Sequence, residues 1–140
     1  SEYFMHRIFY RDRDDVGAVV HAHSTYSATL AALHWEIEPI HYLIGYAGKN
    51  VRCAPYELFG TEKLAKEALE AMEDRNACLL ANHGLLAIGG TIEYAFDTAE
   101  EIEFVAELYY KAKCVGEPIP LKSEEMDEFL EKFKPYGKKL

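Results

Sequence analysis

The chain has 140 residues, the length of one ordinary domain, and 49% of them are apolar or aromatic, which excludes wholesale disorder. Its 15 Lys and Arg against 24 Asp and Glu give a formal net charge of -9, which argues against nucleic acid and anionic membrane surfaces as partners. No long apolar run and no signal-peptide pattern is present, so neither membrane insertion nor export is expected. Three cysteines without CxxC spacing favour a reduced, cytoplasmic protein. The absence of Gln and the presence of three Asn are typical of a thermophilic source.

The first half of the chain predicts two helices and three short strands. Side chains at helical spacing indicate the helices, and short apolar runs bounded by turn residues indicate the strands. The helices are expected over residues 2–13 and 24–34, and the strands over residues 16–20, 39–45 and 50–55. Ser24 is the expected N-cap of the second helix, which is rich in alanine and follows His21-Ala22-His23 directly.

The second half predicts three helices and one pair of strands. Gly60-Thr61 opens a helix, Thr91 caps the longest helix, and Ser123 caps a last amphipathic one that precedes a basic tail over residues 135–139. The expected apolar stripe of the longest helix consists of Ile92, Ala95, Phe96, Ala99, Ile102, Ala106 and Tyr109. Two apolar runs, residues 76–81 and 85–88, are separated only by Asn82-His83-Gly84, which indicates a tight turn between paired strands or a kinked continuation.

These elements predict an α/β fold in which helices cover both faces of one sheet. Short strands connected by turns and by helices with one apolar face favour a mixed, mostly antiparallel sheet in a three-layer α/β/α arrangement. We expect residues 1–140 to form a single domain without internal repeats.

Three of the six histidines form a pattern. His21 and His23 are two residues apart on a strand, so their side chains share one face and lie close together. His83 lies in a turn at the end of another apolar run, from which it can approach the first pair. Three neutral imidazoles bind zinc and leave its fourth position open, as catalytic sites do. The same spacing also fits a half-exposed polar face and an ordinary turn, so spacing alone leaves both interpretations open.

The order of short motifs along the whole chain resembles the class II, zinc-dependent aldolase and epimerase family, and within it the branch that acts on fuculose 1-phosphate. The motifs are Ser1-Glu2, His21-Ala22-His23, Ile40-His41-Tyr42, Cys53-Ala54-Pro55-Tyr56, Asn82-His83-Gly84-Leu85 and Phe133-Lys134-Pro135-Tyr136-Gly137.

The resemblance implies a metal site and a catalytic carboxylate. His21, His23 and His83 match the family's ligands of one Zn²⁺ per subunit. Glu2 matches the carboxylate that serves as general acid and base and also reaches the zinc when no substrate is bound.

Three further residues match family positions that contact the substrate. Tyr42 matches a tyrosine that acts across a subunit boundary, and Tyr136 matches a tyrosine of a mobile C-terminal tail. Both would carry a proton, Tyr42 to or from the sugar hydroxyl. Ser1 matches the last serine of the phosphate-binding loop. Because family members carry a substantial segment before the position of Glu2, we expect this chain to be the C-terminal, larger part of the domain.

The resemblance implies a cytoplasmic homotetramer that is a lyase. It would cleave a ketose 1-phosphate such as fuculose 1-phosphate reversibly to dihydroxyacetone phosphate and an aldehyde, through a metal-stabilised enediolate. A ribulose-5-phosphate 4-epimerase and a sugar-phosphate dehydratase are alternatives on the same fold. A metal-free interaction domain is the alternative from another class, because the superfamily also contains cytoskeletal head domains.

Overall fold

A four-stranded mixed sheet lies at the centre of the molecule. The computed structural model describes the backbone of residues 1–137 and the side chains of residues 1–134. The strands are β1 (Ala18–Ala22), β2 (Arg52–Ala54), β3 (Ala77–Leu80) and β4 (Gly84–Gly89), in the order β1-β4-β3-β2. The pairs β1–β4 and β3–β4 are antiparallel, whereas β2 and β3 are parallel. The prediction of a mixed, mostly antiparallel sheet is therefore confirmed.

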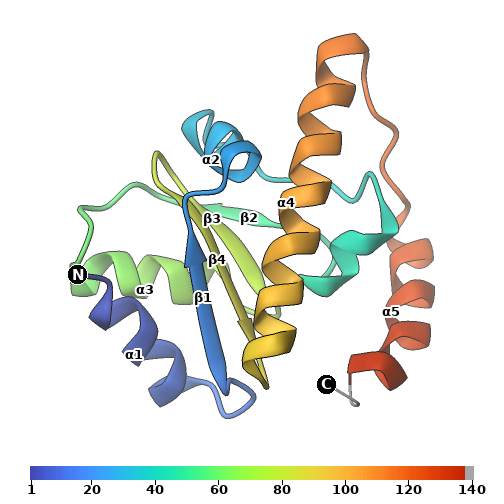
Figure 1. Cartoon of the computed structure of the whole chain (residues 1–140). Helices are drawn as coiled ribbons and strands as arrows, with labels where there is room; N and C mark the ends of the chain where they lie inside the picture. The colour runs from blue at the N-terminus through green and yellow to red at the C-terminus, as the bar shows by residue number, and fades with distance from the viewer. Residues whose placement is uncertain (138–140) are drawn as a thin grey trace.

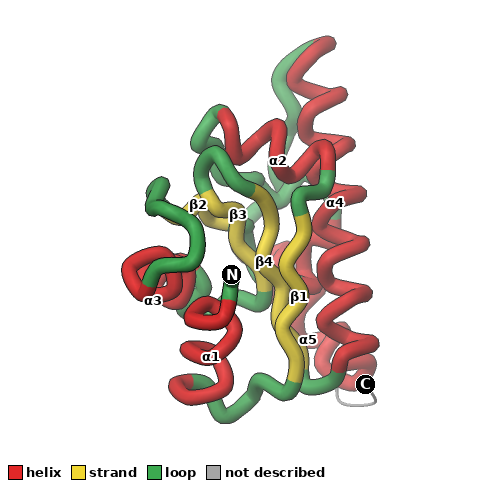
Figure 2. Tube along the Cα trace, turned by 60° about the vertical axis from the view of Figure 1, so that its left-hand side comes forward, coloured by secondary structure: helices red, strands yellow, loops and turns green. Residues whose placement is uncertain are grey.

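Helices cover both faces of this sheet (Figure 1). The helical elements are α1 (Tyr3–Asp12), α2 (Thr25–Ala32), the 3₁₀ helix η1 (Tyr42–Tyr46), α3 (Glu62–Ala71), α4 (Ile92–Val115) and α5 (Ser123–Gly137). Helices α1 and α3 pack together on one side, and α4 runs along the other side with η1 and α5 beyond it (Figures 1 and 2). The three-layer α/β/α prediction is confirmed.

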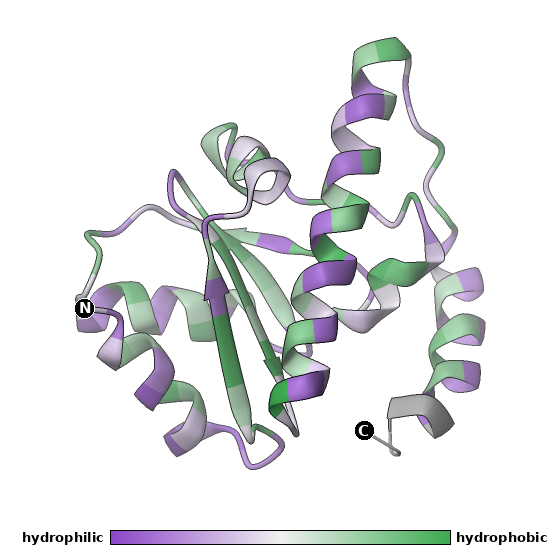
Figure 3. Cartoon of the chain, in the orientation of Figure 1, coloured by the Kyte–Doolittle hydropathy of each residue, from purple (hydrophilic) through white to green (hydrophobic). Residues whose placement is uncertain are grey.

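Each face of the sheet has its own apolar core. Val19 packs with Met5, Phe9 and Leu64 of the α1 and α3 layer, whereas Val20 packs against the α4 side. This alternation follows from the two-residue period of a strand. Strands β3 and β4 are buried along their whole length, because both of their faces are covered. Figure 3 shows the strands as mainly hydrophobic and the helices as mixed in hydropathy.

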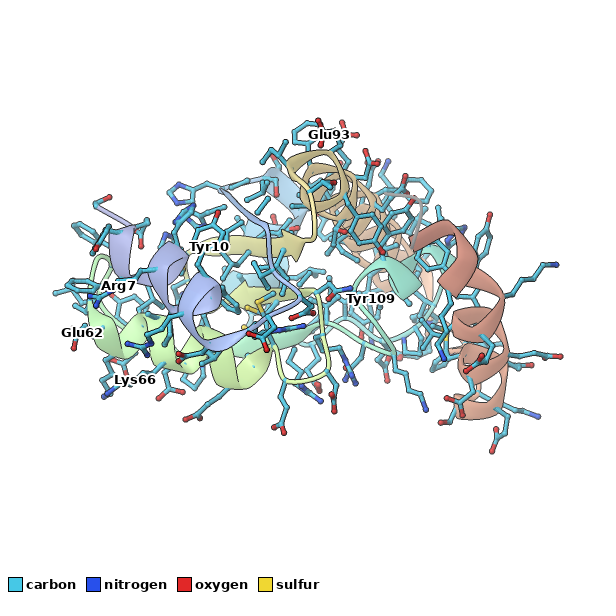
Figure 4. The ribbon with its side chains drawn as sticks, turned by 90° about the horizontal axis from the view of Figure 1, so that it is seen from below. Arg7, Tyr10, Glu62, Lys66, Glu93 and Tyr109 are labelled. Carbon is cyan, nitrogen blue, oxygen red and sulfur yellow. The ribbon has the colours of Figure 1, made fainter. Side chains whose placement is uncertain are left out.

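The outer side of the α1 and α3 layer is charged. Figure 4 shows Arg7, Glu62 and Lys66 together at this surface, and all three side chains are exposed. The two helices therefore bury one apolar face and leave a polar one, as their amphipathic patterns predict. In the part of the chain that the structure describes, no helix has the length and apolar composition needed to cross a membrane.

The strand predicted over residues 39–45 is wrong, because this segment contains η1. The His41 side chain accepts a hydrogen bond from the Leu43 backbone N–H at 3.1 Å and so caps the 3₁₀ turn. Gly45 lies directly against the Phe129 ring, since a Cβ built there would be 2.1 Å from a ring carbon. A short apolar run does not by itself distinguish a strand from a helical turn. Here the cap by the His41 side chain and the contact with Phe129 of α5 stabilise the 3₁₀ turn.

The longest predicted helix is confirmed, but two members of its predicted stripe are exposed. Ile92 and Phe96 are 55% and 53% exposed. Ile92 is the first residue of α4, and Phe96 lies on the flank of the buried stripe, beside an open apolar pocket that Val20 also lines. At the other end of the chain, α5 continues through Gly137 and so extends into the stretch predicted as a tail.

Candidate metal centre

The three predicted histidine ligands converge at one end of the sheet. His21 is on β1, His23 follows the end of β1, and His83 lies in the turn between β3 and β4. In the antiparallel register Ala22 pairs with Leu85, so the end of β1 lies beside that turn. The structure thus brings together residues that are about 60 positions apart in the sequence.

The three rings form a nearly equilateral triangle. The ring centroids are 5.0 Å apart for His21 and His23, 4.8 Å for His21 and His83, and 4.9 Å for His23 and His83. Each ring offers one nitrogen, and these nitrogens all lie within 4.8 Å of one another. The two Nε2 atoms of His21 and His23 are 3.2 Å apart, close to the ~3.3 Å expected between two ligands of tetrahedral zinc. The geometry fits one ion held by three imidazoles.

Hydrogen bonding and burial prepare His21 for this role. Its Nδ1 lies 2.9 Å from the Leu85 carbonyl oxygen, to which a protonated Nδ1 donates, leaving the Nε2 lone pair facing the other rings. Burial lowers the pKa of His21 and that of His83. Both imidazoles are therefore held in the neutral form that binds a metal.

Glu2 places a carboxylate beside the histidines. It precedes the first turn of α1, and its Oε1 lies 3.9 Å from His83 Nε2. The side chain is only 16% exposed, and its Oε2 is buried with no hydrogen-bond partner among the described residues. A buried carboxylate oxygen without a partner is costly, and a cation or substrate group at the histidine cluster would satisfy it. The donor set therefore fits a divalent metal that prefers nitrogen and oxygen ligands.

The turn that carries His83 requires two special residues. Asn82 adopts a left-handed φ of 56°, which asparagine tolerates better than most residues, and its backbone N–H donates to the Ala31 carbonyl oxygen at 3.1 Å. A Cβ at Gly84 would lie 2.4 Å from the Ala22 carbonyl oxygen, so only glycine permits this approach of β4 to the end of β1. The sequence indicated the turn but not these contacts.

Two supporting residues could not be identified from the sequence. The His34 ring is hydrogen bonded to the side-chain oxygen of Asn82, which ties the end of α2 to the β3–β4 turn. Ser24 occupies the N-cap position of α2, as predicted, but its hydroxyl makes no capping hydrogen bond. Glu103 of α4 binds the free N–H groups there instead. These contacts join residues 48 to 77 positions apart, and no local pattern signals them.

Among the described residues, Tyr42 and Ser1 are not part of the histidine cluster within this chain. Tyr42 is 52% exposed, and its ring contacts His41 and Phe129 on the α4 side of the sheet, whereas His21 points to the α1 side together with Val19. Ser1 is exposed at the start of the chain, next to Gly60. The side chain of Tyr136 lies outside the described residues.

Comparison with known proteins identifies the family. Residues 1–110 match the family described as Class II Aldolase and Adducin N-terminal domain. The chain is 55% identical over 137 residues to a 5-deoxy-D-ribulose 1-phosphate aldolase of Bacillus thuringiensis, covering 98% of this chain and 64% of that protein. It is 41% identical over 139 residues to the L-fuculose phosphate aldolase of Escherichia coli K12, covering 98% of this chain and 65% of that protein.

A solved structure agrees with these matches. An L-fuculose 1-phosphate aldolase superimposes with a TM-score of 0.94 at 49% identity, over 95% of this chain and 63% of that one. The chain thus spans slightly less than two thirds of the length of these relatives. The matched family region includes Glu2 and all three histidines. The chain belongs to the class II aldolase and adducin N-terminal domain family.

Proposed function

We propose that the protein is a metal-dependent lyase that cleaves a ketose 1-phosphate reversibly to dihydroxyacetone phosphate and an aldehyde. The observation that carries this proposal is the triangle of His21, His23 and His83 with the buried Glu2 carboxylate 3.9 Å from one of the rings. A family member that had lost its chemistry would have no need to bury an unpartnered carboxylate beside three histidines.

The chain's own residues then have separate tasks. A divalent cation, for which we propose Zn²⁺, supplies Lewis-acid stabilisation of the negative charge that develops on the substrate oxygens. His21, His23 and His83 hold it as neutral ligands, so that its full charge is available. In the synthetic direction Glu2 removes a proton from the hydroxyl-bearing carbon of dihydroxyacetone phosphate, and in the cleavage direction it returns that proton to the carbon.

Two tyrosines and one serine complete the proposal. Tyr42, half-exposed and directed away from the histidines of its own chain, is suited to serve the site of a neighbouring subunit in a homo-oligomer, for which we propose a homotetramer. There it would exchange the proton of the sugar hydroxyl as the carbon–carbon bond breaks. We assign Tyr136 to the closing of the site and Ser1 to the substrate phosphate.

The named activities of the relatives narrow the substrate class. One relative is named for 5-deoxyribulose 1-phosphate and another for fuculose phosphate. Both sugars are ketoses that end in a methyl group, so cleavage between C3 and C4 releases acetaldehyde and lactaldehyde, respectively. We propose a deoxyketose 1-phosphate as the substrate.

A retro-aldol assay of the intact protein tests the reaction. Fuculose 1-phosphate, 5-deoxyribulose 1-phosphate and non-deoxy ketose 1-phosphates are incubated with the protein, and release of dihydroxyacetone phosphate is coupled to NADH oxidation. We expect release from the deoxy substrates. Exchange at a sugar carbon without release would favour an epimerase, and loss of water would favour a dehydratase. No reaction together with no bound metal would favour an interaction domain.

Single substitutions test the assigned roles. We expect His21→Ala and His83→Ala to abolish metal binding, measured as metal content after purification without chelator. Glu2→Gln should retain the metal but lose about 10²- to 10⁴-fold in turnover, because the amide cannot exchange the proton. Glu62→Gln, which removes an exposed carboxylate on α3, is the matched control and should match the wild type. Normal turnover of Glu2→Gln would refute the role of Glu2.

A further inference from the structure

A single carboxylate joins α2 to α4. One oxygen of Glu103 accepts a hydrogen bond from the Tyr26 backbone N–H at 2.9 Å. The other oxygen accepts from the backbone N–H and the hydroxyl of Ser27, both at 2.8 Å. Tyr26 and Ser27 are the second and third residues of α2, and their N–H groups are those that an N-cap side chain normally binds. The cap of α2 is therefore supplied by another helix.

The residue in the N-cap position takes no part in this capping. Ser24 has the extended backbone of an N-cap, with φ -69° and ψ 143°, yet its buried hydroxyl has no hydrogen-bond partner among the described residues. The start of α2 is consequently fixed in space by α4 rather than by its own flanking sequence. The charge of Glu103 adds to this anchoring, because a negative group is stabilised at a helix N-terminus.

Helix α2 contacts both segments that carry the histidines. At its start, Ser24 alone separates it from His23. At its end, the Ala31 carbonyl oxygen accepts the Asn82 N–H, one residue before His83. The His21 ring is held by the Leu85 carbonyl oxygen, but within the described part of the chain no backbone group is hydrogen bonded to the His23 ring. The position of His23 therefore depends on its own backbone, which leads from the end of β1 into the first turn of α2.

We propose that Glu103 is a positioning residue of the metal centre, which fixes His23 relative to His83 by anchoring the first turn of α2 to α4. This inference rests on the proposed function in taking the histidine cluster as a metal site. Glu103 itself does not touch the three rings. Its effect reaches them through α2, whose two ends adjoin the two histidine segments.

Metal affinity distinguishes positioning from general stabilisation. Co²⁺ is titrated into metal-free wild type, Glu103→Gln and Glu103→Ala, in competition with a chromophoric chelator, at a temperature where every variant is folded. We expect Glu103→Ala to bind Co²⁺ at least about tenfold more weakly, the lower end of the range for residues that orient ligands. Glu103→Gln should lie in between, because one amide oxygen replaces two carboxylate oxygens. The Co²⁺ absorption bands should also change, since they report ligand geometry.

Two control variants show whether weaker Co²⁺ binding comes from lost positioning, from the lost charge or from general destabilisation. Glu100→Gln removes an exposed carboxylate one turn away on the same helix and should leave Co²⁺ affinity unchanged. Thr91→Ala removes the side chain that caps α4 by accepting from the Tyr94 N–H, so it destabilises the fold without touching α2. A positioning role requires that Thr91→Ala lower the thermal midpoint but not the affinity. Equal losses of affinity in Thr91→Ala and Glu103→Ala would overturn the proposal.

A measurement on the metal-free protein keeps this test independent of the proposed function. Long-range ¹H–¹⁵N spectra of the histidine rings should show a shifted His23 signal in Glu103→Gln, with His6 and His41 unchanged. An unshifted His23 signal would refute the positioning role even if the metal binds. Failure of the wild type to bind Co²⁺ or Zn²⁺ would refute the metal site, whereas the His23 signal would still decide the role of Glu103. If Glu103→Ala does not fold, Glu103→Gln provides both measurements.

Discussion

At the scale of single residues, burial shifts the protonation of two of the three histidines. It lowers the pKa of His21 and His83 from the ordinary value of 6.5. In the unfolded chain the same rings titrate at about 6.5. Between the lowered and the ordinary pKa, the unfolded state binds more protons than the folded state, so the free energy of unfolding falls as the pH falls through this window.

The metal-free protein should therefore lose stability on acidification. We expect the urea midpoint to decrease from pH 7.5 to pH 5.5, and to decrease less in the double variant His21→Asn, His83→Asn, which lacks both groups. A saturating divalent metal should steepen the dependence, because protons compete with it for the same nitrogens. An equal decrease in the wild type and the double variant would show that other groups control the pH response.

The residue scale also shows how far the sequence predicts the site. His21 and His23 follow from the two-residue period of a strand, and His83 from its turn, once the motif order suggests a family. Asn82, His34 and Glu103 do not follow, because their contacts span large sequence separations and use side chains common on any surface. Ser24 shows the limit of a local rule: its position is that of an N-cap, but a distant carboxylate makes the bonds.

At the scale of elements, the close approach of β1 and β4 determines the site geometry. A methyl group at Gly84 would lie 2.4 Å from the Ala22 carbonyl oxygen and 3.2 Å from a His23 ring carbon. Gly84→Ala should therefore separate the end of β1 from the β3–β4 turn, with a loss of about 1–3 kcal/mol in stability. We expect metal affinity to fall at least tenfold as His23 and His83 move apart.

Gly116→Ala is the matched control for this prediction. Gly116 follows α4, its φ of 174° is extended backbone, and no atom lies within 4 Å of a Cβ built there. The thermal midpoint and metal affinity of Gly116→Ala should equal those of the wild type. Wild-type affinity in Gly84→Ala would mean that the strand ends adjust without moving the histidines.

The elements themselves were predictable where periodicity was long or turn residues were clear. A long apolar stripe predicts α4. The three residues between the two apolar runs allow either a tight turn between strands or a kinked continuation, and the structure shows the turn. The segment 39–45 was mispredicted because its few apolar residues fit either period. Its 3₁₀ conformation depends on the His41 side chain and on packing against Phe129, which only the assembled fold provides.

At the scale of the whole molecule, the three cysteines differ in solvent accessibility, because the helices cover the sheet on both faces. Cys78 on β3 is fully buried and Cys53 on β2 is half-buried, whereas Cys114 is exposed near the end of α4. Burial raises the pKa of Cys53 to about 11, and it also raises the pKa of Cys78. Because the thiolate is the reactive form, both core thiols should be nearly inert in the folded protein at pH 8.

The rates of thiol labelling then measure how often β2 and β3 become accessible to solvent. We expect an aromatic disulfide reagent to label one thiol rapidly in the native protein and three in denaturant, and Cys114→Ser to remove the rapid phase. Labelling of Cys53 should be slow and limited by opening of the sheet edge at β2, because β2 is an edge strand of the described sheet and pairs there with β3. Cys78, in the core on the α1 and α3 side, should react only at the rate of global unfolding. Rapid labelling of two thiols in the native state would mean that β2 is open to solvent. The helices would then not cover this edge of the sheet.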